Sequence, residues 1–145
     1  MPRLLQALAG APHGGAEMHF LRLCVALERA GVDQRVVIRP WPESLEFLRA
    51  GGIDPVTAPF GGILDRQTGR ILREQIADFR PDVVLTYMNR ASAAIPRGDF
   101  VHIARLGGYY NMKYYRNCDH LVCVTPDLKA HCVARGFPTE RVHVV

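Results

Sequence analysis

The clearest structural signal in the chain is Leu4-Leu5-Gln6-Ala7-Leu8-Ala9-Gly10-Ala11-Pro12-His13-Gly14-Gly15-Ala16-Glu17. Leu4–Ala9 is an apolar run of strand length, and a glycine-rich turn follows it. Ala16–Ala30 then has the apolar periodicity of a helix that lies largely buried against a sheet, and Gly31 ends it. A strand, a tight turn and a buried helix in this order predict the opening unit of an α/β domain with a parallel sheet.

Strand-length and helical segments alternate through the rest of the chain. The expected strands are Gln34–Arg39, Asp54–Ala58, Asp82–Tyr87, Phe100–Arg105, Leu121–Val124 and Val142–Val145. The expected helices are Glu43–Ala50, Arg66–Phe79, a short one near Ala91–Ile95, and one that starts at the N-cap Thr125 and ends at Gly136. We therefore predict a single α/β domain over residues 1–145, a Rossmann-like open parallel sheet with helices on both faces.

Composition narrows the possible partners. The 145 residues carry a formal net charge of +4 without a dense Lys/Arg run, so a nucleic-acid partner is not expected. No apolar run approaches the roughly 20 residues that span a bilayer, and we expect a cytoplasmic protein. The four cysteines (Cys24, Cys118, Cys123 and Cys132) lack metal-ligand spacing, which favours reduced, buried thiols over a metal site.

Four loops follow the carboxyl ends of the expected strands, where open parallel sheets bind ligands. They are Gly10–Ala16, Tyr87–Arg90, Arg105–Tyr110 and the segment at Thr125, and we expect them to line one cleft. Gly14-Gly15 stands directly before the first helix, so bare amides and the positive helix end can face a phosphate. A plain strand-to-helix turn is the alternative, since the glycine spacing does not match the dinucleotide fingerprint.

Five segments resemble glycosyltransferase family 4. They are Gly14-Gly15-Ala16-Glu17, Ala30-Gly31-Val32, Arg80-Pro81-Asp82-Val83-Val84, Cys118–Lys129 and Gly136-Phe137-Pro138-Thr139-Glu140-Arg141-Val142. Each motif alone is weak, but they occur in the family's order and on the expected elements. The resemblance covers nearly the whole chain.

The resemblance implies a GT-B enzyme of which this chain is the amino-terminal, acceptor-side domain. The carboxy-terminal domain, which would bind most of the nucleotide, is not in the sequence, so the chain alone should not turn over. The implied reaction is retaining transfer from a UDP- or GDP-sugar without a metal or other cofactor, and no Asp-x-Asp pair is present. Helix N-termini and basic groups would stabilise the departing diphosphate.

The distribution of basic residues suggests the acceptor and the setting. We expect a lipopolysaccharide or other cell-envelope glycan or glycolipid, glycosylated at the inner face of the membrane. A basic bias in one region suits peripheral contact with the anionic inner-membrane surface; its residues are Arg90, Arg97, Arg105, Lys113 and Arg116.

Site residues follow from the resemblance and the loop positions. The expected donor-binding residues are Gly14, Gly15, Ala16 and Thr125. The expected substrate-binding residues are His13, Asn89, Arg90, Gly107, Gly108, Tyr109, Tyr110 and Lys113. Many family members have a histidine after the fifth strand, where this chain has Arg105; His102 comes three residues earlier, inside the strand. Arg105 is therefore the candidate catalytic residue, able to fork onto a phosphate.

Structural alternatives accompany several of these assignments. Arg105 could form only a salt bridge, Asn89 could cap a helix, and Glu17 is expected to hold the first loop rather than to take part in chemistry. The tyrosines of 109–115 could simply pack their loop onto the sheet. The histidines expected to be surface or packing residues are His19, His120, His131 and His143. The competing functions are a Rossmann-type nucleotide-sugar epimerase or dehydrogenase, and a non-catalytic nucleotide- or glycan-binding module.

Overall fold

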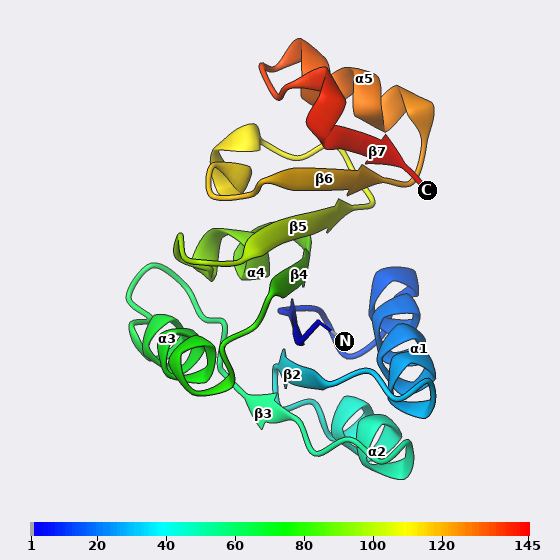
Figure 1. Ribbon diagram of the computed structural model, residues 1–145, viewed down its shortest axis with the longest axis vertical. Helices are drawn as coiled ribbons and strands as arrows, with labels where there is room; N and C mark the ends of the chain where they lie inside the picture. Colours follow the sequence, from blue (N-terminus) through cyan, green and yellow to red (C-terminus); the bar gives the residue numbers. More distant parts are fainter. Residues whose placement is uncertain (1) are drawn as a thin grey trace.

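The computed structural model describes residues 2–145 as a seven-stranded parallel sheet flanked by helices (Figure 1). The strands are β1 (Leu4–Leu8), β2 (Gln34–Ile38), β3 (Val56–Thr57), β4 (Val83–Tyr87), β5 (Val101–Leu106), β6 (His120–Cys123) and β7 (Val142–Val144). The helices are α1 (Gly15–Arg29), α2 (Pro42–Ala50), α3 (Gln67–Phe79), α4 (Met88–Ala94) and α5 (Pro126–Ala134), with 3-10 helices η1 (Met112–Tyr115) and η2 (Thr139–Arg141). The predicted Rossmann-like α/β class is confirmed.

The strand order is β3-β2-β1-β4-β5-β6-β7, and every neighbouring pair is parallel. The order reverses between β1 and β4, where Leu8 pairs with Tyr87 at the last register position. Loops that leave the carboxyl ends of two strands diverge at such a reversal, and open α/β sheets place their ligands there. The turn after β1 and the end of β4 are therefore the first places to examine for a site.

Successive side chains of each strand enter different cores because they point to opposite faces of the sheet. Leu8, Ile38 and Tyr87 pack with α1 and α2 on one face. Leu5 and Val84 pack with α3 and α4 on the other face. A third cluster on β5 and β6 packs against η1 and α5. Figure 1 shows α1 and α2 on one side of the sheet and α3 on the opposite side. This double coverage explains the continuous apolar runs in the strands.

The helix α1 is less buried than its sequence predicts. Its buried residues are Phe20, Leu21, Cys24 and Val25, whereas Met18, Arg22 and Ala26 are exposed on the opposite side. The apolar pattern covers most of the helix surface, but within residues 2–145 the sheet and α2 cover chiefly one side of it. The prediction of a largely buried helix is therefore wrong for its outer face.

Other local differences affect the site. The helix α4 begins at Met88, directly after β4, so the expected loop Tyr87–Arg90 is the start of a helix. Met88 makes this abrupt turn with a φ of 66°, in the left-handed region. The strand β3 is reduced to two residues, and η1 and η2 were not predicted.

The four cysteines are buried free thiols, as predicted. Within residues 2–145, no helix is both long and apolar enough to cross a membrane.

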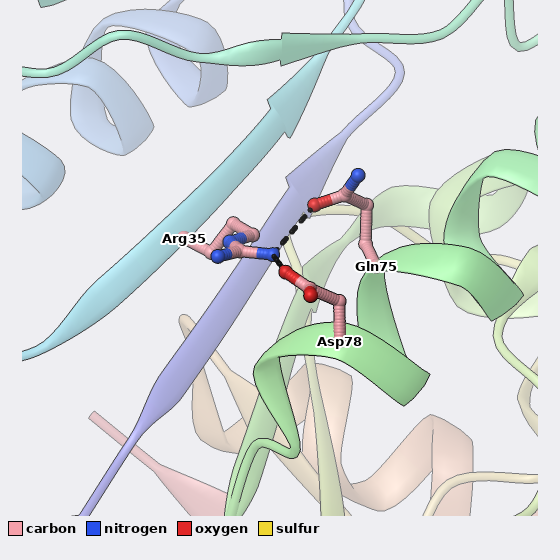
Figure 2. A network of polar contacts seen from close by, with 3 residues as sticks. All are labelled: Arg35, Gln75 and Asp78. Atoms are coloured by element: carbon pink, nitrogen blue, oxygen red, sulfur yellow. Dashed lines mark hydrogen bonds and ion pairs between the residues drawn. The ribbon is translucent and has the colours of Figure 1, made fainter.

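A polar contact ties β2 to α3 across the sheet edge. The guanidinium of Arg35 donates to Gln75 at 3.0 Å and to the Asp78 carboxylate at 2.6 Å (Figure 2). The guanidinium carbon of Arg35 also lies 4.8 Å from the centre of the Phe79 ring. Asp78 is largely solvent-exposed, so water screens the ion pair and the contact orients α3 more than it stabilises the domain.

Candidate functional site

The turn after β1 leaves one glycine open to solvent. Gly15 is the first residue of α1, and no heavy atom lies within 4 Å of the position that a Cβ would take there. Gly14, the N-cap, has a φ of 152° and carries no side chain that could cap the helix. The backbone N–H groups of the first helical turn therefore have no side-chain cap and can bind an anion.

Glu17 controls the other side of this turn. Its carboxylate accepts a hydrogen bond from the Ala11 amide at 3.1 Å, and it fills the space beside Gly10 and Gly14 where a Cβ would otherwise fit. The expectation that Glu17 holds the loop is confirmed. Because a carboxylate next to Gly14 repels other anions, the open approach to the helix end is on the Gly15 side.

Three side chains from different elements meet beside this turn. His19 lies one helical turn after Gly15 and lines the same hollow of 460 Å³ along α1. Its Nδ1 lies 2.8 Å from the hydroxyl of Tyr87, the last residue of β4. Arg105 of β5 places its guanidinium carbon 5.3 Å from the centre of the Tyr87 ring. The ring is fixed from below by an edge-on contact with Phe20, at 5.1 Å between centroids.

The electrostatics leave one positive charge in this cluster. Burial lowers the pKa of His19, and the nearby positive charge of Arg105 lowers it further. Burial raises the pKa of Tyr87 to about 12, against the opposing effect of Arg105. At neutral pH the imidazole and the phenol are therefore uncharged, and Arg105 supplies the cation. Gly15, His19 and Arg105 together offer an amide, an imidazole and a guanidinium, groups that bind phosphate oxygens.

Sequence reasoning placed Gly15 and Arg105 here but missed His19 and Tyr87. The signal for His19 was its spacing, because residues four apart on a helix share one face and Gly15 precedes it by four. The signal for Tyr87 was its place at the end of the strand beside β1. The strand order that makes β4 the neighbour of β1 is a tertiary feature, so the meeting of the two residues was not visible locally.

The remaining residues of the first loop face α2. His13 Nδ1 lies 3.3 Å from the Glu43 carboxylate, and both side chains are exposed. They border a second hollow, which Phe47 and Met18 also line. Ala16 is half-buried in the first turn of α1. His13 therefore lies on the α2 side of the turn.

Thr125 and the glycines after β5 lie along the same sheet edge. The Thr125 hydroxyl accepts a hydrogen bond from the Leu128 amide at 3.1 Å, so the predicted N-cap of α5 is confirmed. Gly107 has open space around its Cβ position, whereas Gly108 lies against the Tyr110 ring. Only Gly107 leaves room for a ligand to approach its backbone.

Asn89 and Arg90 take part in internal contacts. Asn89 is the second residue of α4, and its Oδ1 accepts a hydrogen bond from the Tyr115 hydroxyl at 2.7 Å. It does not cap the helix, so that alternative is wrong. Arg90 donates to the Phe60 carbonyl at 2.9 Å and lines a third hollow beside α3.

The tyrosine segment divides into packing and exposed residues. Tyr115 is fully buried and Tyr110 stacks on it, with 6.3 Å between ring centroids, so packing explains these two. Lys113 places its ammonium 4.9 Å from the centre of the Tyr114 ring. Tyr109 is 61% exposed, and it contacts the Asp127 carboxylate and the edge of His131. Tyr109 is the aromatic residue of this segment that is most available to a ligand.

The expected single cleft is thus divided. Contacts connect Gly15 to Arg105 through His19 and Tyr87, whereas His13 and Arg90 line separate hollows. The reason is that α4 starts at the end of β4 without a loop and turns its first residues toward η1 and the β3–α3 segment.

The fold and the turn at Gly15 define the class of protein: a Rossmann-like α/β domain with an anion-binding geometry at the reversal of strand order. The comparisons make the assignment specific. The model of Glycosyltransferase Family 4 matches residues 13–145. The chain belongs to glycosyltransferase family 4.

Two curated relatives come from Rhizobium meliloti. The chain is 38% identical over 138 residues to the lipopolysaccharide core biosynthesis glycosyltransferase LpsD, and 31% identical over 141 residues to LpsE of the same description. Each match covers 88% of this chain and 38% of the relative. The chain therefore spans well under half the length of the relatives that it matches.

Solved structures with the same fold include enzymes of two kinds. The lipopolysaccharide outer core galactosyltransferase WaaB superposes with a TM-score of 0.68 at 12% identity, over 99% of this chain and 45% of that one. Anabaena HepE in complex with UDP-glucose superposes with a TM-score of 0.73 at 12% identity, over 100% of this chain and 43% of that one. UDP-GlcNAc 2-epimerase from Neisseria meningitidis superposes with a TM-score of 0.74 at 16% identity, over 98% of this chain and 45% of that one. At these identities the likeness is one of fold, and the family assignment rests on sequence.

Proposed function

We propose that this chain is the amino-terminal, acceptor-side domain of a retaining glycosyltransferase that uses a UDP- or GDP-sugar without a metal ion. We propose lipopolysaccharide core or another cell-envelope glycan as the acceptor class, at the inner face of the membrane. Both lipopolysaccharide-core relatives and the complex of HepE with UDP-glucose support the proposal. A second, donor-binding domain would be needed for turnover.

The observation that carries the proposal is the uncapped amide turn at Gly15, which His19 and Tyr87 connect to the Arg105 cation, in a member of this family. Departure of a nucleoside diphosphate leaves negative charge on its phosphate oxygens, and fixed donors stabilise that charge most when water is excluded. In our proposal Gly15 and Arg105 contact those oxygens. Tyr87 holds His19 through Nδ1, which leaves Nε2 to contact the diphosphate or the sugar.

The first experiment expresses the complete reading frame of the gene and measures release of UDP or GDP from a panel of nucleotide sugars with lipopolysaccharide-core acceptors. We expect turnover that persists in the presence of a chelator, and a product whose anomeric configuration by NMR matches that of the donor. Inverted stereochemistry would refute the retaining mechanism. An absence of transfer from every UDP- and GDP-sugar would refute the donor class.

Matched variants test the site itself. Gly15→Asp places a negative charge at the open turn without a steric clash, because the Cβ position is free. Ala50→Asp puts the same charge on the exposed last residue of α2, outside the hollow that Gly15 and His19 line. We expect Gly15→Asp and Arg105→Gln each to lower kcat/KM about 100-fold, and Ala50→Asp to leave it unchanged. Equal activity of Gly15→Asp and Ala50→Asp would disprove the anion site.

A further inference from the structure

The two most exposed aliphatic side chains of residues 2–145 are neighbours in the sequence. Ile63 is 101% exposed and Leu64 is 91% exposed, whereas Val101, at the start of β5, is 42% exposed. They form the tip of a turn in which the Asp65 amide donates to the Gly62 carbonyl at 3.0 Å. This turn belongs to the segment between β3 and α3, which arches outward at the side of the molecule (Figure 1). Two adjacent aliphatic side chains that both stand fully in solvent form an apolar patch, and such patches on soluble proteins mark contact surfaces.

The base of this segment is tightly built. The Asp65 carboxylate accepts backbone hydrogen bonds from Gly61 at 2.8 Å, Gln67 at 3.0 Å and Thr68 at 3.2 Å, as well as one from the Thr68 hydroxyl. The Phe60 amide donates to the Thr68 hydroxyl at 2.8 Å, and the Phe60 ring is buried. These hydrogen bonds hold the pKa of Asp65 below its usual value.

Two arginines secure the segment from the sheet side. Arg39 donates to the Phe60 carbonyl at 2.6 Å and Arg90 donates to the same oxygen at 2.9 Å. The polar groups at the base of the segment are thus hydrogen-bonded within the protein, while the two aliphatic side chains are exposed. A segment held in this way presents Ile63 and Leu64 outward as a fixed tip.

The surroundings of the tip are cationic. A hollow of 560 Å³ beside it is lined by Ile63, Arg90 and Tyr114, and the ammonium of Lys113 lies over the Tyr114 ring. Arg66 follows the tip by two residues and is exposed. The carboxylate of the lining, Asp65, is engaged by the hydrogen bonds of the loop. An aliphatic tip with basic residues around it is complementary to the headgroups and upper acyl chains of an anionic bilayer.

We propose that Ile63 and Leu64 insert into the surface of an anionic lipid bilayer, with Arg66 and Lys113 facing the lipid phosphates. Two side chains are too small an area for a stable protein partner, which buries about 800 Å² on each side, but they suit shallow insertion. The inference rests on the peripheral membrane contact in the proposed function and names the surface that makes it. Vesicle binding needs neither donor nor acceptor, so the two proposals can fail separately.

The experiment uses the protein expressed from its complete reading frame and sedimentation with vesicles of phosphatidylcholine, with or without phosphatidylglycerol. The test variant is Ile63→Ser/Leu64→Ser, and the matched control is Val101→Ser. We expect binding to the anionic vesicles, a loss of about ten-fold or more in the double variant, and no loss in the control. Lys113→Gln should weaken binding about five-fold at low salt, since one basic residue near the membrane contributes about 1 kcal/mol.

Several results would overturn the proposal. These are no binding of the wild type to anionic vesicles, unchanged binding of the double variant, or an equal loss in Val101→Ser. If another part of the complete polypeptide covers the tip instead, Ile63→Ser/Leu64→Ser would lower the thermal midpoint and vesicles would not bind, which also refutes it. A Leu64→Trp variant gives a direct readout, because its added emission should shift to the blue with anionic vesicles while the emission of the wild type does not.

Discussion

Mild acid should destabilise this domain through His102. The imidazole lies in β5 and is 1% exposed, with Nε2 2.8 Å from the Thr86 hydroxyl. That hydroxyl lies 2.8 Å from the Ser92 hydroxyl, so the ring is part of a buried polar chain. Burial lowers the pKa of His102 from 6.5 to about 4, because the charged form loses its hydration.

The sign and size of the effect follow from proton linkage. As the pH falls from 6.5 towards 4, the unfolded chain binds a proton at His102 and the native protein does not. Stability contributed by the neutral ring is therefore present above pH 6.5 and lost across this window. The two pKa values give a loss of about 2 kcal/mol between about pH 8 and about pH 5.

The assay is urea unfolding of the wild type, His102→Gln and His13→Gln at both pH values. Carboxylates contribute to acid destabilisation in all three proteins, so the informative quantity is the difference between them. We expect His102→Gln to lose about 2 kcal/mol less than the wild type on acidification, a difference of about 1 M in urea midpoint. His13→Gln removes an exposed histidine and should follow the wild type. Equal pH dependence of His102→Gln and the wild type would refute the reasoning.

Three further tests concern the packing at Gly51, the N-cap of α5 and the ion pair of Asp78. Gly51→Ala brings a Cβ to 2.5 Å from a methyl carbon of Val25 and should lower the unfolding free energy by about 1–3 kcal/mol. Gly62→Ala is the control, because the Cβ position there has open space, and it should leave the stability unchanged. Equal stability of the two variants would contradict this prediction. Thr125→Ala removes the N-cap of α5 and should cost about 1 kcal/mol by urea unfolding, and an unchanged midpoint would argue against the cap. Asp78→Asn should cost at most about 1 kcal/mol, and less at high salt; a salt-independent loss would contradict a screened ion pair.

The site was only partly predictable from the chain. Gly15 was proposed because glycines before a buried helix are a local pattern, and Arg105 because it stands where the resemblance leads one to expect a histidine. His19 was expected to be a surface or packing residue and it is exposed, but nothing near it in sequence indicates its contact with Tyr87, 68 positions away. Asn89 and Arg90 were assigned to a loop because the left-handed turn at Met88, which starts α4 early, has no glycine to signal it.

By itself, the order of apolar segments and glycine turns determined the α/β class, most strands and helices, and the capped start of α5. These are local consequences of side-chain periodicity and backbone conformation. The tertiary structure alone decided that β1 lies beside β4, that His19, Tyr87 and Arg105 meet there, and that Ile63 and Leu64 stand outside the core. The physical reason is that strand order and burial depend on contacts between residues far apart in the chain, and a local pattern specifies which side chains need a partner but not which partner they find.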